Sequence, residues 1–385
     1  MGERGALQPG APLPRGAAPQ PRRPPRRPGR PLVTTAHGTE GAVPGQRPVE
    51  LLLAGPGRLL IRPLGPPAGP APGEVVVRVD RVGLCGSDYR LYQGTYGGPC
   101  AYPLRFGHEW AGEVVAAGPG AGRLLGRTVT GDCSRWCGRC DRCRTDRNLC
   151  RSIEKFGLTT DGFSSRYVHV PARYLYPDPH GLPPDLLALT ELFAVALRGL
   201  RKAPAPAAAP VLVIGAGPLG LAVRLLATST YPASRVHLLE SDRRKVETLA
   251  RRVPGLVWHA PEETPAPGGT PDASAPPGYP LVVDCAGAGE SLNTALRLTE
   301  PGSTVVYFGL QRTTGVRCDL LTTKGLTVLG SVGGTGAFPE AMRFLSRHVE
   351  EARLLLTHRY PAHQAAEALR ADAGSRIKTQ LLFDH

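Results

Sequence analysis

A cysteine, a histidine and a glutamate that could share one metal ion lie close together in this chain. Cys85 is followed by His108 and, directly after it, by Glu109. Zn²⁺ binds cysteine sulfur, histidine nitrogen and carboxylate oxygen, and a catalytic zinc site keeps one position open. The sequence therefore predicts a catalytic zinc ion bound by Cys85, His108 and Glu109. The alternative is that Cys85 is a small buried apolar residue and His108 a hydrogen-bonded core histidine.

Two polar residues follow the cysteine closely enough to belong to the same site. Side chains two residues apart lie on the same side of an extended segment, so Ser87 is predicted to carry a proton beside Cys85. Metal-bound histidines usually donate their second N–H to a carboxylate or carbonyl. Asp88 is therefore predicted to accept a hydrogen bond from this second N–H of His108.

Four further cysteines form a second cluster, with the spacing C-x2-C-x2-C-x6-C. They are Cys137, Cys140, Cys143 and Cys150, and they span 14 residues. Four thiolates so close in sequence can close a tetrahedral zinc site that has no open position, which gives the ion a structural role. Disulfides are the alternative, but tight C-x2-C spacing in a reducing compartment favours metal. Cys133 is a spare thiol that could substitute as a ligand.

A glycine-rich turn follows the apolar run 211–214, which is typical of a buried parallel strand. The turn consists of Gly215, Gly217, Pro218, Leu219 and Gly220. Its glycines permit a tight turn, close approach of a pyrophosphate and close packing of the following helix. A helix that begins there presents its positive end to the phosphates. The sequence thus predicts a dinucleotide site.

The adenine ribose has a candidate partner at the end of the next predicted strand. Glu240 lies 20 residues after Gly220, where an acidic residue accepts hydrogen bonds from the ribose 2′-hydroxyl. A carboxylate also repels a 2′-phosphate, so NAD is predicted rather than NADP. The nearby Arg243 and Arg244 keep NADP open as the alternative.

With these three motifs in this order, the chain resembles the zinc-dependent medium-chain alcohol dehydrogenases over residues 47–385. It is most similar to their polyol branch, which includes sorbitol, threonine, sugar and cyclitol dehydrogenases. The resemblance implies an α/β fold, with a GroES-like, mostly β catalytic domain and a Rossmann domain containing a doubly wound parallel sheet.

The resemblance also implies a division of the chain. We expect a disordered Pro/Arg-rich arm at 1–47, a catalytic domain at 48–202 with the structural zinc lobe at 133–150, an NAD-binding domain at 203–334 and a C-terminal part at 335–385 that returns to the catalytic domain. Residues 261–279 are rich in proline, glycine and alanine, and are predicted to form a loop in place of a crossover helix.

Two site residues follow from the resemblance. Glu191 is the single carboxylate in the apolar helical pattern 186–197, and is implied to face the zinc or its water; a helix-surface glutamate is the alternative. Many relatives carry a proton-relay histidine five residues after the zinc cysteine, where this chain has Arg90. A guanidinium stays charged and cannot act as a base. Arg90 is predicted to hold a hydroxyl or anionic group of a polar substrate, or else to be a solvated surface arginine. Relatives usually have seven residues between the third and the last cysteine of the structural zinc lobe, and this chain has six.

The implied reaction is hydride transfer between an alcohol and NAD, with one catalytic and one structural zinc per chain. A secondary alcohol of a polyol, sugar, cyclitol or aminocyclitol of antibiotic biosynthesis is the predicted substrate. An amino alcohol of the threonine type or a simple sugar is the alternative.

Composition limits the remaining possibilities. The net charge is +14, of which residues 1–48 contribute +6, so a zinc-lobe nucleic-acid-binding protein with a basic arm remains a remote alternative. That arm could also result from an upstream translation start that the cell does not use. No apolar run reaches the length of about 18 residues that a membrane span needs. We expect no nucleic acid or membrane partner, a cytoplasmic location, and a homodimer or homotetramer as in relatives.

Overall fold

The computed structural model describes most of the chain after residue 48. The described residues are 34–35 (backbone only), 49–204, 209–231, 235–253, 255–260, 278–287, 290–310, 315–374 and 376–383. All of them belong to the unit Leu32–His385. The predicted arm, apart from Thr34–Thr35, and residues 261–277 of the predicted loop lie outside the described residues. Among the described residues, no helix combines the length and apolar character of a membrane span.

The mostly-β lobe begins with a hairpin, β2 (Val49–Gly55) and β3 (Arg58–Pro63), which pair antiparallel. Gly57 makes the turn with a positive φ of 68°, which glycine adopts without strain. β4 (Glu74–Leu84) is the central strand, because its β-branched residues Val75, Val76 and Val77 are fully buried. β4 pairs antiparallel with β6 (Glu109–Ala117), so the start of β6 lies beside the end of β4.

The other elements of this lobe are short. They are β1 (Thr34–Thr35), α1 (Gly86–Gln93), β5 (Leu104–Arg105), η1 (Gly122–Leu124), β7 (Thr128–Gly131), β8 (Ser134–Arg135), α2 (Asp141–Thr145), η2 (Arg147–Leu149), β9 (Glu154–Lys155), β10 (Tyr167–Pro171), η3 (Ala172–Tyr174) and β11 (Leu175–Pro177). The sheet orders are β1-β3-β2-β5, β8-β9 and β11-β7-β6-β4-β19-β18, with β10 also paired to β4.

The parallel-sheet lobe contains six strands in the order β14-β13-β12-β15-β16-β17, which is the doubly wound arrangement. The strands are β12 (Val211–Ile214), β13 (Val236–Leu239), β14 (Val257–His259), β15 (Tyr279–Asp284), β16 (Thr299–Tyr307) and β17 (Thr327–Gly330). All neighbouring pairs are parallel. The helices of this lobe are α5 (Pro218–Thr230), α6 (Arg243–Arg252), α7 (Ser291–Leu298) and α8 (Cys318–Thr323). The predicted Rossmann sheet is therefore confirmed.

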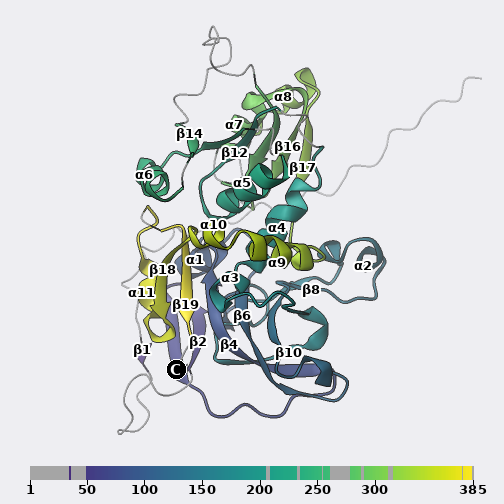
Figure 1. Ribbon diagram of the computed structural model, residues 1–385, viewed down its shortest axis with the longest axis vertical. Coiled ribbons are helices and arrows are strands. Elements are labelled where there is room, and N and C mark those ends of the chain that lie inside the picture. The colour runs from purple at the N-terminus through teal and green to yellow at the C-terminus, as the bar shows by residue number, and fades with distance from the viewer. Residues whose placement is uncertain are drawn as a thin grey trace, which may run out of the picture. The chain divides into compact units, whose positions relative to one another are not determined.

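Two helices precede β12. The apolar pattern 186–197, which suggested one long helix, is divided into α3 (Pro184–Leu187) and α4 (Thr190–Leu200). The residues between them are fully buried, and α4 packs on α5 and α9 against one face of the parallel sheet (Figure 1). α7 covers the other face, where a smaller core of its own forms.

The C-terminal segment adds strands to the mostly-β lobe. α9 (Phe338–Arg347) and α10 (Val349–Arg353) lead into β18 (Leu356–Pro361), η5 (Ala362–Gln364), α11 (Ala365–Arg370) and β19 (Lys378–Leu382). β19 pairs antiparallel with β4, with Thr379 opposite Leu84. The last strand therefore lies against the end of β4 (Figure 1), which Cys85 directly follows in the sequence.

Candidate active site

The three predicted ligands of the catalytic zinc lie at one end of the central strand pair. Cys85 follows β4 and is the N-cap of α1, while Glu109 opens β6 and pairs with Gly83 of β4. The candidate ligand atoms of Cys85, His108 and Glu109 all lie within 4.8 Å of one another. Cys85 is half-buried, and the other two are buried. Sulfur, nitrogen and oxygen donors gathered in this way fit a zinc ion with an open position.

A lysine that sequence analysis missed completes this group. Lys378, at the start of β19, forms an ion pair with Glu109, and its Nζ donates to the carbonyl of Leu84 at 3.1 Å. Both side chains are almost completely buried. Burial alone would lower the pKa of Lys378, but the charges of Glu109 and Cys85 raise it above its usual value. A Cβ on Gly83 would lie 3.1 Å from Glu109 Oε2, so glycine leaves room for this pair.

Asp88 does not play the part that the sequence suggested. Its Oδ1 lies 4.0 Å from His108 Nδ1, which is too long for a hydrogen bond. The carboxylate instead accepts from Cys85 N at 2.8 Å and Gly107 N at 3.1 Å, and so ties the start of α1 to the loop before His108. The prediction was wrong because residues 86–93 are helical, and the carboxylate caps that helix.

Ser87 and Glu191 are both available for proton chemistry. Ser87 lies in the first turn of α1, not in the extended segment that its predicted orientation assumed, and its buried Oγ has no hydrogen-bond partner among the described residues. Glu191 lies in the first turn of α4 and is buried. Burial raises the pKa of Glu191 to about 7; the charge of His108 lowers it and that of Glu109 raises it. It can thus exchange a proton near neutral pH.

The four cysteines of the second cluster lie together as predicted. Their sulfurs are all within 4.8 Å of one another. Three of the separations are 3.5, 3.9 and 3.9 Å, close to the roughly 3.8 Å edge of a tetrahedron with Zn–S bonds of about 2.3 Å. A disulfide would need about 2.05 Å. The end of α2 and all of η2 lie in the six residues between Cys143 and Cys150. Cys133 lies outside this group, with its Sγ 3.8 Å from the Phe156 carbonyl.

The glycine-rich turn has the local geometry that a dinucleotide requires. Gly215 has a φ of +94°, and α5 begins at Pro218 after Gly217. A Cβ on Gly220 would lie 1.8 Å from the Gly215 carbonyl oxygen, so only glycine lets α5 pack this closely on the turn. A Cβ on Gly217 would meet nothing within 4 Å, which leaves open space above the turn. Leu219 follows Pro218 in the first turn of α5.

Glu240 follows β13 and is held by several donors. It accepts from Ala216 N at 2.9 Å, Ser241 N at 2.9 Å and Asp242 N at 3.0 Å, while Lys245 Nζ lies 3.3 Å away. Burial raises the pKa of Glu240, but the N–H of Asp242 and the charge of Lys245 outweigh burial and lower it overall. Sequence analysis missed Lys245, although a lysine five residues after Glu240 near the start of α6 could have indicated it.

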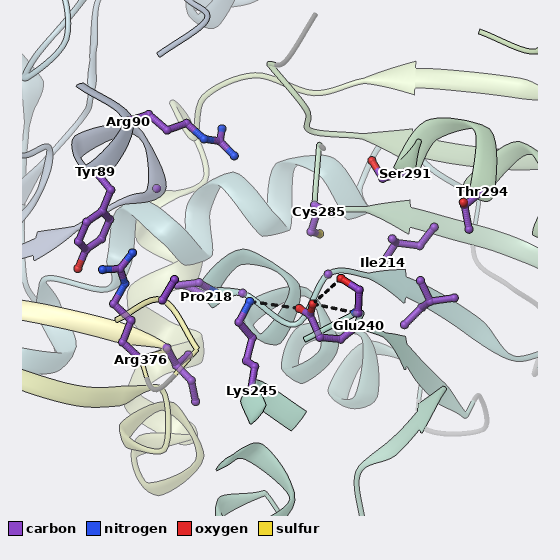
Figure 2. Close-up of a pocket in the computed structure, with 18 of the residues that line it drawn as sticks. Tyr89, Arg90, Ile214, Pro218, Glu240, Lys245, Cys285, Ser291, Thr294 and Arg376 are labelled. Atoms are coloured by element: carbon purple, nitrogen blue, oxygen red, sulfur yellow. Dashed lines mark hydrogen bonds and ion pairs between the residues drawn. The ribbon is translucent and has the colours of Figure 1, made fainter. Parts of the chain in front are cut away.

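One pocket contains both this turn and residues of the mostly-β lobe. The cavity has a volume of ≈ 680 Å³ and is lined by Gly215, Pro218 and Glu240 on one side and by Arg90 and Arg376 on the other. Figure 2 shows Arg90 extending from α1 into this pocket, across from Pro218 and Glu240. Arg90 therefore faces the predicted cofactor cleft. Arg376 was not noticed in the sequence.

Two candidate metal sites, one of four cysteines and one of Cys85, His108 and Glu109 next to a dinucleotide-type cleft, are typical of zinc-dependent dehydrogenases. Comparison with known proteins identifies the class as a family. The model of the alcohol dehydrogenase GroES-like domain matches residues 71–180, and that of the zinc-binding dehydrogenase matches residues 261–347. L-galactonate-5-dehydrogenase of Escherichia coli is 31% identical, over 79% of this chain and 89% of that protein. The chain belongs to the zinc-dependent medium-chain alcohol dehydrogenases, in their polyol and threonine branch.

Two other proteins support this placement. L-threonine 3-dehydrogenase of Pyrococcus horikoshii is 29% identical, over 80% of this chain and 91% of that protein. A structure described as a zinc-binding dehydrogenase from Sinorhizobium meliloti, bound to NADP, has a TM-score of 0.78 and 28% identity. It covers 88% of this chain and 99% of that one. The expected family and fold are thereby confirmed.

Proposed function

We propose that this enzyme transfers a hydride between NAD and a secondary alcohol of a polyol, sugar or (amino)cyclitol. The observation that carries the proposal is the convergence of Cys85, His108 and Glu109 at the end of β4, beside the pocket that contains Gly215 and Glu240. A zinc ion can make a hydroxyl more acidic and a nicotinamide can accept a hydride, so these two sites together support alcohol oxidation and the reverse carbonyl reduction.

Zinc held by Cys85, His108 and Glu109 would make a substrate hydroxyl more acidic. Nicotinamide supplies the hydride acceptor. In the proposed mechanism, Ser87 Oγ accepts the hydroxyl proton while its own proton passes to water, because its buried oxygen has no other partner among the described residues. Arg90 cannot extend this relay as a base. Glu191, with a pKa of about 7, holds or releases a proton beside the metal site.

Glu109 has two possible partners, the zinc ion and Lys378. We propose that it binds the metal in one state of the enzyme and turns to Lys378 in another, since the ion pair with Lys378 offers it an alternative position. The variant Glu109→Gln tests this step. We expect lower zinc content or a lower rate; unchanged zinc content together with an unchanged rate would remove the step from the mechanism.

The substrate is proposed to be a polar compound with several hydroxyl groups. Two relatives are named for threonine and galactonate, both of which carry a hydroxyl beside other polar groups. A panel of polyols, sugars, sugar acids, threonine, myo-inositol and an aminocyclitol, followed by NADH absorbance, tests the proposal. Activity confined to threonine would establish the amino-alcohol alternative, and activity confined to plain short alcohols would overturn the polyol assignment.

NAD is proposed as the preferred cofactor. Glu240 is an acceptor for ribose hydroxyls, and its carboxylate opposes a 2′-phosphate. Lys245 and Arg244 stand nearby, but Lys245 is paired with Glu240, and Arg244 lies 3.5 Å from Asp242 and 3.7 Å from Asp372. We expect tighter binding of NADH than of NADPH in parallel titrations. The Sinorhizobium protein binds NADP, so the reverse order is the outcome to look for against this proposal.

The enzyme is also proposed to form a homodimer or homotetramer. β17 pairs only with β16 among the described residues, so it leaves one strand edge unpaired. Val328 and Val332 are each 38% exposed, and α8, which precedes β17 in the sequence, buries no residue. An exposed apolar edge strand tends to pair with another chain. Light scattering after size-exclusion chromatography would test this, since a monomeric mass at micromolar concentration contradicts it.

A further inference from the structure

Two arginines of the mostly-β lobe face the glycine-rich turn across one pocket. Arg90 comes from α1, and Arg376 comes from the segment before β19. Figure 2 shows both guanidinium groups on the side of the pocket that lies across from Glu240. Neither residue was predicted to contact the cofactor. Two arginines that face one pocket favour the binding of an anion there.

Arg90 is a half-buried cation whose side chain has no partner in the part of the chain that the structure describes. Among the described residues its side chain makes no hydrogen bond and no ion pair, and its backbone carbonyl helps to close α1. A guanidinium that loses part of its hydration without a partner is unfavourable, so such groups usually bind an anion. The site of Arg90 is therefore incomplete in the protein alone.

Arg376 is held in a defined orientation. Its Cζ lies 3.4 Å from the ring centroid of Tyr89, which is buried, and its Nη1 donates to the Ala371 carbonyl at 2.6 Å. Stacking and one hydrogen bond fix the plane of the guanidinium but leave most of its five N–H donors unused. A guanidinium that is already oriented loses little entropy when it binds a planar or tetrahedral anion.

The opposite side of the pocket also favours an anion. α5 has 13 residues and starts at Pro218, so its first turn offers backbone N–H groups and a positive helix end. The remaining charged side chains of the pocket are Glu240, Lys245 and Glu290. Glu240 is paired with Lys245, and Glu290 accepts from Asn293 at 2.7 Å. Arg90 and Arg376 thus give the pocket an unbalanced positive charge opposite the turn.

We propose that Arg90 and Arg376 bind the pyrophosphate of the nicotinamide dinucleotide, from the lobe that does not contain the glycine-rich turn. The proposal rests on the assignment of this pocket to the cofactor. It gives Arg90 a role in holding the cofactor, in place of the substrate contact expected from the sequence. It also explains why an arginine occupies a position at which relatives carry a proton-relay histidine: here the position binds charge and does not move protons.

The test is a set of binding titrations with Arg90→Gln, Arg376→Gln and Arg376→Lys, and with Arg123→Gln as an exposed control of equal charge change. NADH binding is followed by its fluorescence, and ADP-ribose and adenosine compete for the site. Hydrogen bonds to a charged group are strong, so each glutamine variant should bind NADH and ADP-ribose about tenfold more weakly or worse. Adenosine, which lacks the pyrophosphate, and the control should each stay within about twofold of wild type.

Each contrary result has its own meaning. Equal loss of adenosine binding would show general damage to the pocket and overturn the proposal, as would unchanged NADH binding. Unchanged NADH binding with a raised KM for the alcohol would return Arg90 to the substrate. If Arg376→Gln loses stability with its Tyr89 contact, Arg376→Lys keeps the charge without the fork and should still weaken ADP-ribose binding. If wild-type protein binds neither NADH nor NADPH, the cofactor assignment itself fails.

Discussion

Lys378 and Glu109 form an ion pair in the interior of the mostly-β lobe, with 0% and 1% of their side chains exposed. The pair joins the last strand of the chain to the first residue of β6, which is a candidate zinc ligand. Lys378 lies 294 residues after Leu84 in the sequence. Because β19 pairs with β4, its Nζ nevertheless also donates to the carbonyl of Leu84. The C-terminal strand thereby supports the candidate metal site directly.

Lys378→Met should destabilise the protein strongly. The substitution keeps most of the side-chain volume but leaves Glu109 buried without its cation, and removing one partner of a buried pair typically costs about 3–5 kcal/mol. Urea denaturation of metal-free protein measures the loss, because a bound zinc ion would give Glu109 a second cation. The double variant Lys378→Met/Glu109→Gln should recover part of it, since no uncompensated charge remains. A single variant as stable as wild type would mean that Glu109 has another partner.

Cys150→Ser should remove one zinc ion and leave the other in place. The thiolates of Cys137, Cys140 and Cys143 alone leave one corner of the tetrahedron without sulfur, so metal affinity and local stability fall. Zinc content per chain and the melting temperature are measured, with Cys318→Ser as the control because that thiol is exposed and outside both clusters. Full zinc content in Cys150→Ser would contradict the four-sulfur site.

Glu191 should make the stability of metal-free protein depend on pH. Burial raises its pKa from the usual 4.5 to about 7. The folded state therefore keeps a proton that the unfolded state has released, so the contribution of Glu191 to stability is lost as pH rises from about 4.5 to 7. At about 1.4 kcal/mol per pH unit the loss is about 3 kcal/mol. In Glu191→Gln the slope over this range should be smaller by that amount, which denaturation between pH 4.5 and 8 can check. An identical slope in both proteins would place the titration elsewhere.

The motifs that could be predicted from sequence are those whose residues are close together along the chain. The lobe cysteines lie within one loop, and the turn from Gly215 to Gly220 is set by local steric requirements, so spacing alone carries the information. Lys378 and Arg376 could not be found in this way, because β-sheet pairing across most of the chain brings them to the site. Asp88 was misassigned for a different reason: the residues after Cys85 form a helix, and the carboxylate caps it.

Two glycines of the same turn should respond differently to alanine. Gly220→Ala places a Cβ 1.8 Å from the Gly215 carbonyl oxygen, so α5 has to move and the protein should lose about 1–3 kcal/mol of stability or more. Gly217→Ala meets nothing within 4 Å, and the φ of Gly217 is −74°, which alanine adopts without strain. Its methyl group would instead stand where the pyrophosphate approaches.

We therefore expect Gly217→Ala to keep wild-type stability and to bind NADH about tenfold more weakly or worse, while Gly220→Ala is less stable even without cofactor. Urea denaturation and NADH fluorescence titration separate the two effects. Wild-type NADH affinity in Gly217→Ala would show that the dinucleotide does not pass over this turn.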